Sequence, residues 1–340
     1  MSSPSYRPLG TSGLKVSQLC VGSMMFGGPC PEAEAQRIVA HAADHGVNFI
    51  DTANTYEKGR SEEVVGRIIA RSRGAWVLAT KLAQPMGPGP NDRGLSRRNM
   101  IQATDASLAR LGTDWIDISY VHRVDGNVPW VEVARTFGDL IRAGKIRYWG
   151  LSNVRAWHIP VIVQACKEAG TPPPVVLQPY YNVMTRMPEV ELLPAARAFD
   201  LGVAIYSPLA RGILSGKYQP GSNAPPDTRA GRNDRRMMQT EWRPESLAIA
   251  QSLKAHAEGK GRTLVDLAVA WALANVAVTS VIAGPRTFEQ WQQYVAALDY
   301  PWTAEDEALV DRLVPPGHPS SPGYTDPEYP VEGRYRRSGA

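Results

Sequence analysis

The feature that most constrains the fold of this chain is a unit that repeats along most of its 340 residues. Each unit has a short run of apolar and β-branched residues, a turn, and a longer segment with apolar residues at helical spacing. The eight runs expected to form strands are Leu19–Gly22, Asn48–Asp51, Trp76–Lys81, Ile116–His122, Tyr148–Ser152, Val175–Pro179, Gly202–Tyr206 and Thr279–Ile282. Alternating strands and helices are typical of a parallel sheet, and eight units predict a closed (β/α)8 TIM barrel of the α/β class.

An open, doubly wound sheet would show the same alternation of strands and helices. Such a sheet usually has fewer strands and often carries a glycine-rich phosphate loop after its first strand. The run Val21–Gly28 contains glycines but does not have the GxGxxG spacing of that loop. The closed barrel is therefore the favoured architecture.

Several helices have recognisable start and stop signals. We expect Ser61 to begin Glu62–Ser72, Ser96 to begin Arg97–Leu111, and Thr263 with Asp266 to begin Leu264–Ala274. Gly46, Gly112 and Gly170 are expected to end helices, because glycine adopts the left-handed conformation readily. An extra helix is predicted over Thr303–Leu313, after the eighth unit.

Three segments lie outside the repeat. Residues 1–15 contain a predicted hairpin, Tyr6–Lys15, which could plug one mouth of the barrel. Residues 218–242 form a long irregular loop rich in Pro, Gly, Asn and Arg, a type of segment that often serves as a lid. Residues 315–340 are a Pro/Gly/Ser/Tyr-rich tail without helical pattern, and with no boundary before it we predict one domain over residues 1–340.

Composition narrows the class of partner and the compartment. The formal net charge is only +4 and long basic runs are absent, so we do not expect a nucleic-acid partner; the cluster Arg229–Arg236 could face solvent or an anionic cofactor. Cys20, Cys30 and Cys166 lack metal-ligand spacing, so no metal is predicted. The chain has neither an apolar signal core nor a membrane-spanning run, and we expect a cytoplasmic protein without membrane association.

Titratable side chains stand at the ends of three neighbouring strands. Asp51 ends the second, with Tyr56 shortly after it, Lys81 ends the third, and His122 ends the fourth. In a (β/α)8 barrel the working residues lie at these carboxyl ends. A Lys that ends an apolar strand is costly to desolvate, and Asp51 on the adjacent strand is its natural counter-charge.

The sequence around these residues resembles the aldo-keto reductase superfamily. The likeness lies in Asp51–Tyr56, in Lys81 at the end of an apolar strand, and in Val121–His122. Further motifs resemble those of the family in family order: Trp149–Asn153, Gln178–Asn182, Tyr206–Leu209 and Gly284–Thr287. The likeness extends from about Tyr6 to Leu313. Within the superfamily, His122–Asp125, Gly144–Arg147 and Leu214–Tyr218 are similar to the branch that includes potassium-channel β subunits and many bacterial reductases.

The resemblance implies an NADP(H)-dependent oxidoreductase that reduces aldehyde or ketone carbonyls to alcohols, or catalyses the reverse. Tyr56 would donate the proton to the carbonyl oxygen, where negative charge develops. Lys81 would bring the Tyr56 pKa down from its ordinary value near ~10, and Asp51 would keep Lys81 protonated. His122 would orient the carbonyl by a hydrogen bond.

The cofactor contacts implied by the resemblance come from several loops. Ser152, Asn153 and Gln178 would hold the nicotinamide carboxamide and Tyr206 would stack on its ring, whereas Ser207, Pro208, Leu209, Gly212 and Lys217 would surround the pyrophosphate. Arg229 and Arg286 would contact phosphate and Gln290 the adenosine, which favours NADP over NAD. The remaining expected contacts are Gly22, Ser23, Met24, Asp51, Ala210, Gly284, Gln293 and Tyr294.

Two short segments depart from the family pattern. Gln293 and Tyr294 stand where the family usually has Glu-Asn facing the adenine, so Gln293 could hydrogen-bond and Tyr294 could stack or simply pack. Met24 and Met25 occupy a loop in which many relatives have a Trp, and methionine is flexible enough to give an adaptable substrate wall.

Two rival functions stay open. The first is a nicotinamide-binding accessory or regulatory subunit with little turnover, and the second is a glycoside hydrolase built on a carboxylate pair such as Asp51 and Asp125. The small-molecule carbonyl or alcohol substrate, the direction of reaction and the oligomeric state cannot be read from the loops 84–95 and 123–129 or from the tail. Trp130, Tyr324 and Tyr329 could line an apolar pocket.

Overall fold

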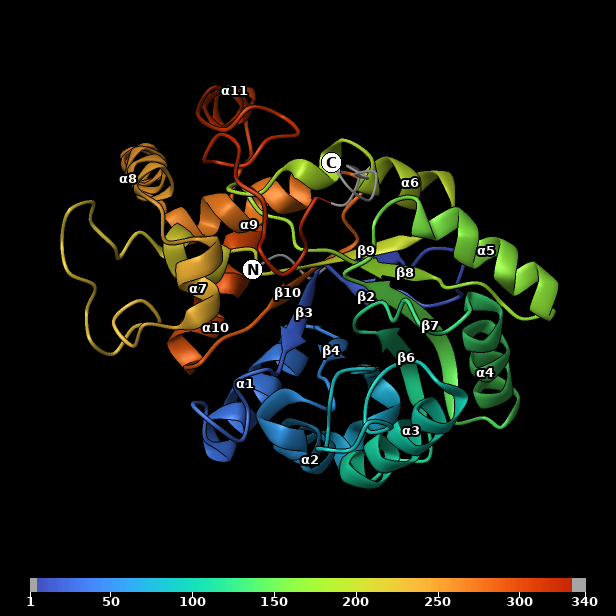
Figure 1. Ribbon diagram of the computed structural model, residues 1–340. Coiled ribbons are helices and arrows are strands. Elements are labelled where there is room, and N and C mark those ends of the chain that lie inside the picture. Colours follow the sequence, from blue (N-terminus) through green and yellow to red (C-terminus); the bar gives the residue numbers. More distant parts are fainter. Residues whose placement is uncertain (1–4, 332–340) are drawn as a thin grey trace, which may run out of the picture.

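The barrel of the computed structural model, which describes residues 5–331, is closed and made of eight parallel strands. In chain order the strands are β3 (Leu19–Gly22), β4 (Phe49–Asp51), β5 (Val77–Leu82), β6 (Ile116–Val121), β7 (Ile146–Ser152), β8 (Val176–Gln178), β9 (Gly202–Tyr206) and β10 (Ser280–Ala283). Each strand pairs with the next, and β10 returns to pair with β3, aligning Val281 with Leu19. The predicted (β/α)8 barrel is confirmed, with each strand within two residues of the expected bounds at either end (Figure 1).

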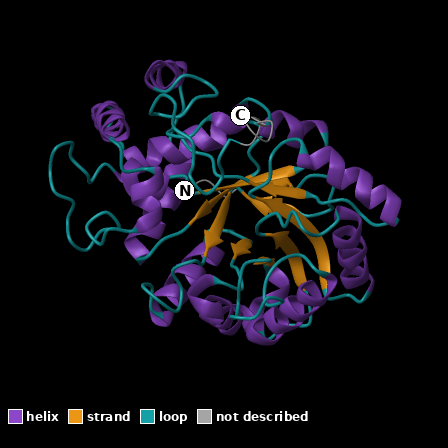
Figure 2. Ribbon diagram, viewed as in Figure 1, coloured by secondary structure: helices purple, strands orange, loops and turns teal. Residues whose placement is uncertain are grey.

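Helices surround the strands (Figure 2). They are α1 (Glu32–Asp44), α2 (Arg60–Ile69), α3 (Arg97–Leu111), α4 (Trp130–Arg142), α5 (His158–Ala169), α6 (Leu192–Ala198), α7 (Arg235–Thr240), α8 (Pro244–Gly259), α9 (Leu264–Ala274), α10 (Phe288–Ala296) and α11 (Ala304–Leu313). The cap of α3 at Ser96 and the capping box of α9 at Thr263 and Asp266 are as predicted. In the described residues, none of these helices has the length and apolar character needed to cross a membrane.

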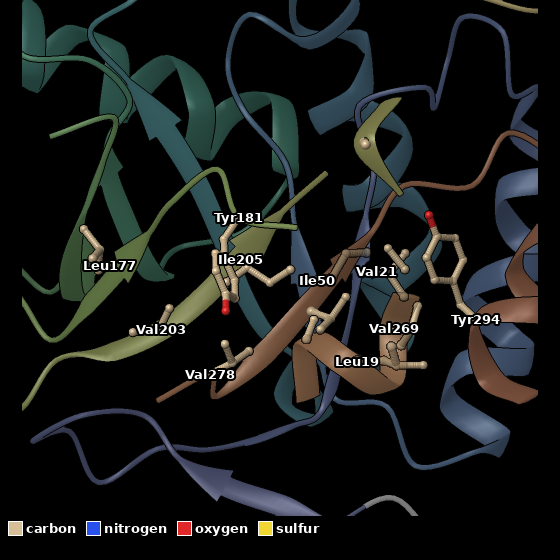
Figure 3. Packing of buried hydrophobic residues seen from close by; sticks show 14 of the residues in the cluster. Leu19, Val21, Ile50, Leu177, Tyr181, Val203, Ile205, Val269, Val278 and Tyr294 are labelled. Atoms are coloured by element: carbon tan, nitrogen blue, oxygen red, sulfur yellow. The ribbon is translucent and has the colours of Figure 1, made fainter. Parts of the chain in front are cut away.

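Alternation along each strand divides the apolar residues between two clusters. Leu19, Val21 and Ile50 point outward and pack beneath the helices, as the close-up of the outer cluster shows (Figure 3). Cys20 and Phe49 point the other way and fill the barrel interior. This period of two is what a pleated strand imposes, and it determines which face each terminal polar residue will take.

An antiparallel hairpin closes the amino-terminal mouth of the barrel. It consists of β1 (Tyr6–Pro8) and β2 (Lys15–Ser17), so its second strand runs past the expected end at residue 15. Leu9 and Val16 are fully buried and join the interior cluster. The interior is therefore sealed at this end, and a ligand reaches the strand termini from the opposite face.

Two sequence expectations need correction. Ser61 does not cap α2: the helix begins after Gly59, which is left-handed, and Ser61 is buried within its first turn, where its hydroxyl donates to the Ser23 carbonyl at 2.7 Å. The segment 218–242, expected to be irregular, contains the short helix α7, which Asp234 caps by accepting a hydrogen bond from the Met237 amide.

The described part of the tail, residues 315–331, crosses the carboxyl end of the barrel strands, and we call it the strap. Arg236 of α7 donates to both carboxylate oxygens of Asp326, at 2.6 and 3.0 Å. Arg155 donates to the carbonyls of Tyr329 and Pro330. The strap is thus fixed to the segment 218–242 and to the start of α5.

Candidate active site

The alternation of the strands brings the predicted polar residues to one place. Each of them follows an interior residue of its strand by two positions, so it also points inward, at the carboxyl end of the barrel. These pairs are Phe49 and Asp51, Ala79 and Lys81, Tyr120 and His122, Val176 and Gln178, and Ala204 and Tyr206.

Lys81 is the centre of this group. Its side chain is fully buried, and its ammonium donates three hydrogen bonds: to Asp51 Oδ2 at 2.5 Å, to the Thr52 carbonyl at 2.7 Å, and to the Tyr56 hydroxyl at 3.1 Å. The other Asp51 oxygen accepts from Gln178 Nε2 at 2.9 Å. An ammonium can only donate, so the Tyr56 oxygen accepts from Lys81 and keeps its own hydrogen free for another acceptor.

Burial and charge set the protonation of these groups. Burial alone would lower the pKa of Lys81, but the Asp51 charge, the Tyr56 oxygen and their hydrogen bonds outweigh it and raise the Lys81 pKa. Burial raises the pKa of Tyr56 above its usual value even though Lys81 pulls it down. Lys81 lowers the pKa of Tyr56 as expected, but desolvation is the larger influence, so the net pKa lies above the usual value rather than below it.

His122 lies beside Tyr56, with the two rings edge to face and their centroids 6.1 Å apart. Burial, with the nearby Lys81 charge, lowers the pKa of His122 to about 3. The imidazole is therefore neutral across the physiological range, and its buried Nδ1 has no hydrogen-bond partner among the described residues. The backbone carbonyl of His122 accepts a hydrogen bond from Asn153 Nδ2 at 2.8 Å, which links the end of the fourth barrel strand to the end of the fifth.

The residues expected to hold a nicotinamide are linked to one another. Tyr206 donates through its hydroxyl to Asn153 Oδ1 at 2.9 Å, and Ser152 donates to the Gln178 carbonyl at 2.9 Å. The ring of Tyr206 lies against that of Tyr180, with centroids 5.3 Å apart. Asn153 has a left-handed backbone at φ 56°, which suits Asn better than most residues.

A cleft of about 750 Å³ opens above these groups. Its wall contains Asp51, Tyr56, His122 and the predicted nicotinamide residues. It also contains a cluster of cations, Lys217, Arg229, Arg232 and Arg286, whose charges act on one another. Arg232 and Arg286 both donate to the Asp227 carbonyl, at 2.9 and 3.1 Å. The cleft therefore contains both a proton-handling group and a site suited to phosphate.

The charges in the cation cluster are only partly compensated. The pKa of Lys217 is lowered by desolvation and by the neighbouring Arg286 charge. Burial also lowers the pKa of Arg229, and Asp234 opposes this from a distance beyond ion-pair contact. The only hydrogen bond given by the Arg229 guanidinium within the described residues goes to Met25 Sδ, at 3.8 Å. Such a group gains most from an anionic ligand.

Most of the predicted cofactor residues line this cleft. They are Gly22, Met24, Asp51, Ser152, Asn153, Gln178, Tyr206, Ser207, Pro208, Leu209, Gly212, Lys217, Arg229, Gly284, Arg286, Gln290, Gln293 and Tyr294. Ser23 and Ala210 do not: both are fully buried beneath it, and Ser23 bonds to Ser61 Oγ at 2.8 Å. Tyr294 is almost completely buried and packs in the outer cluster, whereas Gln293 is exposed.

Other cleft residues were not singled out from the sequence. Arg211, Asp227 and Glu328 are among them, and Tyr329 was named only as a wall residue. Neither Trp130 nor Tyr324 lines the cleft. Within residues 5–331, no group of three or more His, Cys, Asp or Glu side chains is arranged to bind a metal ion.

The Asp51–Lys81–Tyr56 group and the neighbouring His122 lie at the carboxyl end of the barrel strands, and residues 18–315 match the family model described as Aldo/keto reductase family. The chain belongs to this family, as the sequence motifs predicted.

Relatives of both expected kinds are found. A probable voltage-gated potassium channel subunit beta of Arabidopsis thaliana is 39% identical over 300 residues, covering 86% of this chain and 91% of the relative. Its counterpart in Oryza sativa subsp. japonica is 38% identical over the same shares. An uncharacterized oxidoreductase of Bacillus subtilis, YrpG, is 36% identical over 336 residues, covering 95% and 98%. Together with the family match, these relatives support a general oxidoreductase role.

Proposed function

We propose that this protein is an NADP(H)-dependent reductase of aldehyde or ketone carbonyls, able to run in either direction. The observation that carries the proposal is the Tyr56 hydroxyl, which accepts a hydrogen bond from Lys81 at 3.1 Å and keeps its own proton free on the cleft side. A proton donor must hold its proton at working pH, and the raised pKa of Tyr56 meets this requirement.

The remaining catalytic roles follow from charge. As the carbonyl oxygen gains negative charge, Tyr56 passes it a proton, and the fixed Lys81 ammonium stabilises the phenolate that is left. Asp51 keeps Lys81 charged and aimed through their 2.5 Å contact. The neutral His122 offers one N–H to the substrate oxygen, which aligns the carbonyl without adding a second positive charge.

The residues of the cleft fit a phosphorylated dinucleotide. Bound NADPH would supply the hydride. Tyr206 would face the nicotinamide, Gly212 at φ 109° leaves room for close approach of a pyrophosphate, and Arg229 with Arg286 would receive the ribose phosphate. Because these cations have few acidic partners, a cofactor with an extra phosphate gains more than NAD(H) does.

An accessory role is the second candidate, since two relatives are named as probable channel β subunits. A protein with this role would bind the cofactor in the same cleft and convert little substrate. The complete proton-donor group favours catalysis, because an accessory subunit has no use for a free Tyr56 proton beside a charged Lys81.

The test is NADPH oxidation with a panel of aldehydes and ketones, and NADP reduction with the matching alcohols, in the wild-type protein and in Tyr56→Phe. The variant should lose about a hundredfold or more in kcat, since it removes the general acid, while NADPH still quenches tryptophan fluorescence with wild-type affinity. Tyr6→Phe, which removes a hydroxyl bonded to the Gly46 carbonyl at the far end of the barrel, is the matched control.

Cofactor binding without turnover of any compound by the wild-type protein would favour the accessory role. Near-normal turnover by Tyr56→Phe would remove Tyr56 from the mechanism.

A further inference from the structure

Arg211 is a cation of the cleft wall that the roles above leave unused. It follows Ala210 in the 3-10 segment η4 (Ala210–Ser215) and is one of the residues that line the cleft with Tyr56 and His122. Its charge lowers the pKa of both Tyr56 and Tyr206, although burial raises each of them more. The guanidinium also lies 5.8 Å from the centre of the Tyr180 ring, which packs against the Tyr206 ring at 5.3 Å.

Two neighbouring cations are matched by acids. Lys81 is held by Asp51. Arg236 is held by Asp326 at 2.6 Å and by Glu328 at 3.5 Å. In contrast, Arg211 has no carboxylate within 4.0 Å anywhere in the described residues. Like Arg229, it is a cation of the cleft that no acidic side chain contacts within those residues.

The side chain is held in place although its charge is unmatched. Arg211 Nε donates to Thr240 Oγ1 of α7 at 3.1 Å, and the guanidinium carbon lies 5.8 Å from the centre of the Tyr180 ring. The Nε bond leaves the two terminal nitrogens of the guanidinium without a hydrogen bond from the described residues. A planar fork of this kind binds a carboxylate through two parallel hydrogen bonds.

The backbone at this position favours a residue without a side chain. Arg211 has a left-handed conformation, φ 51° and ψ 17°, in which glycine is the relaxed choice. Ala210 before it and Gly212 after it also have positive φ. An arginine held in such a conformation points to a role for its side chain rather than for its backbone.

From these contacts we infer that Arg211 selects carbonyl substrates that carry a carboxylate, such as short oxo acids and semialdehydes. The carboxylate lies against the free fork of Arg211 while Tyr56 and His122 hold the carbonyl oxygen. This inference rests on the proposed carbonyl reduction and names the substrate class for it. Arg211 acts as a specificity residue and takes no part in proton transfer.

The experiment compares substrates of the same shape that differ in charge: formylbenzoate and formylbenzamide, each as meta and para isomers, with NADPH at saturation. The measured quantity is the ratio of kcat/KM for the acid to that for the amide. Wild-type protein should prefer at least one acid isomer, and Arg211→Met should reduce that preference by about tenfold or more. Arg211→Lys, which keeps the charge and loses the fork, should give an intermediate ratio.

The control is Arg197→Met, which makes the same change of net charge on the opposite face. Arg197 is exposed at the end of α6, where it borders a hollow beside Gly10 of the hairpin. It should leave the ratio unchanged. Circular dichroism and thermal melting verify that each variant is folded, and if Arg211→Met fails to fold, Arg211→Lys alone decides through its ratio.

The outcomes separate this inference from the proposed function. Turnover of the amides with no preference for either acid overturns the role of Arg211 and leaves carbonyl reduction standing. Lack of turnover of all four aldehydes by the wild-type protein overturns the role of Arg211, and carbonyl reduction is overturned as well only if the whole panel of aldehydes and ketones is also inert. A loss of NADPH affinity in Arg211→Met that matches the loss in acid turnover assigns the fork to the cofactor and also overturns the inference.

Discussion

Breaking the buried ion pair by Asp51→Asn is the sharpest energetic test of the site. The Lys81 side chain is 0% exposed and that of Asp51 only 3%. In the variant the Lys81 ammonium keeps the Thr52 carbonyl and the Tyr56 hydroxyl but loses its only counter-charge within residues 5–331. Removing one partner of a buried pair leaves an uncompensated charge and typically costs about 3–5 kcal/mol.

Urea unfolding at neutral pH, followed by circular dichroism and by tryptophan fluorescence, measures this loss of free energy of unfolding. The double variant Asp51→Asn/Lys81→Met removes the stranded charge and should regain most of the loss. An exposed pair provides the comparison: Arg67 binds both oxygens of Glu32 at 2.8 and 2.9 Å, yet Glu32→Gln should cost less than about 1 kcal/mol.

The reasoning fails if Asp51→Asn unfolds within about 1 kcal/mol of the wild-type protein, because Lys81 would then not depend on its partner. It also fails if the double variant is no more stable than Asp51→Asn alone.

Three further predictions concern other parts of the chain. Arg286→Ala should weaken NADPH binding about tenfold or more and leave NADH binding nearly unchanged, as measured by fluorescence titration. Burial raises the pKa of Glu241 to about 8, so Glu241→Gln should be more stable than wild type, by an amount that grows as pH rises from about 4.5 to 8 and then levels off at no more than about 5 kcal/mol in urea unfolding. Gly66→Ala should cost about 2 kcal/mol or more in the same assay, because a Cβ there would lie 2.2 Å from the Leu111 carbonyl, whereas Gly259→Ala, with open space around it, should be slightly stabilising.

The sign for Glu241 follows from where protons bind. Between the unfolded and folded pKa values the native carboxyl keeps a proton that the unfolded chain has released, so wild-type stability falls as pH rises. A stability difference between Glu241→Gln and wild type that stays constant with pH would contradict the raised pKa. Equal losses of NADPH and NADH affinity would mean that Arg286 does not read the extra phosphate. A stable Gly66→Ala would show that α2 and α3 can separate at little cost.

The barrel and its proton-handling group were predictable because each depends on local pattern. Strand runs with a period of two fix the inward direction of Asp51, Lys81 and His122 as soon as the strands are placed. Asp51 and Lys81 end adjacent strands, so contact between these two follows from the topology.

The features that were missed depend on contacts between segments far apart in the chain. Glu328 reaches the cleft because Arg236 and Arg155 hold the strap across the barrel. The upward shift of the Tyr56 pKa also depends on the folded chain, because burial of the side chain causes it. Ser61 has the sequence signal of a helix cap, but such a signal does not reveal whether the hydroxyl is buried against another segment.

The pairing of β10 with β3 has a consequence for how the chain acquires this structure. The strand that completes the sheet is separated from its partner by nearly the whole barrel sequence, so this contact carries a large loop-closure entropy and slows folding. Until Ser280–Ala283 leaves the ribosome, β3 and β9 each present an open edge, and open edges recruit strands from other chains. The protein has a sheet without edges only when its last barrel strand arrives, and its exposure to aggregation is greatest just before that point.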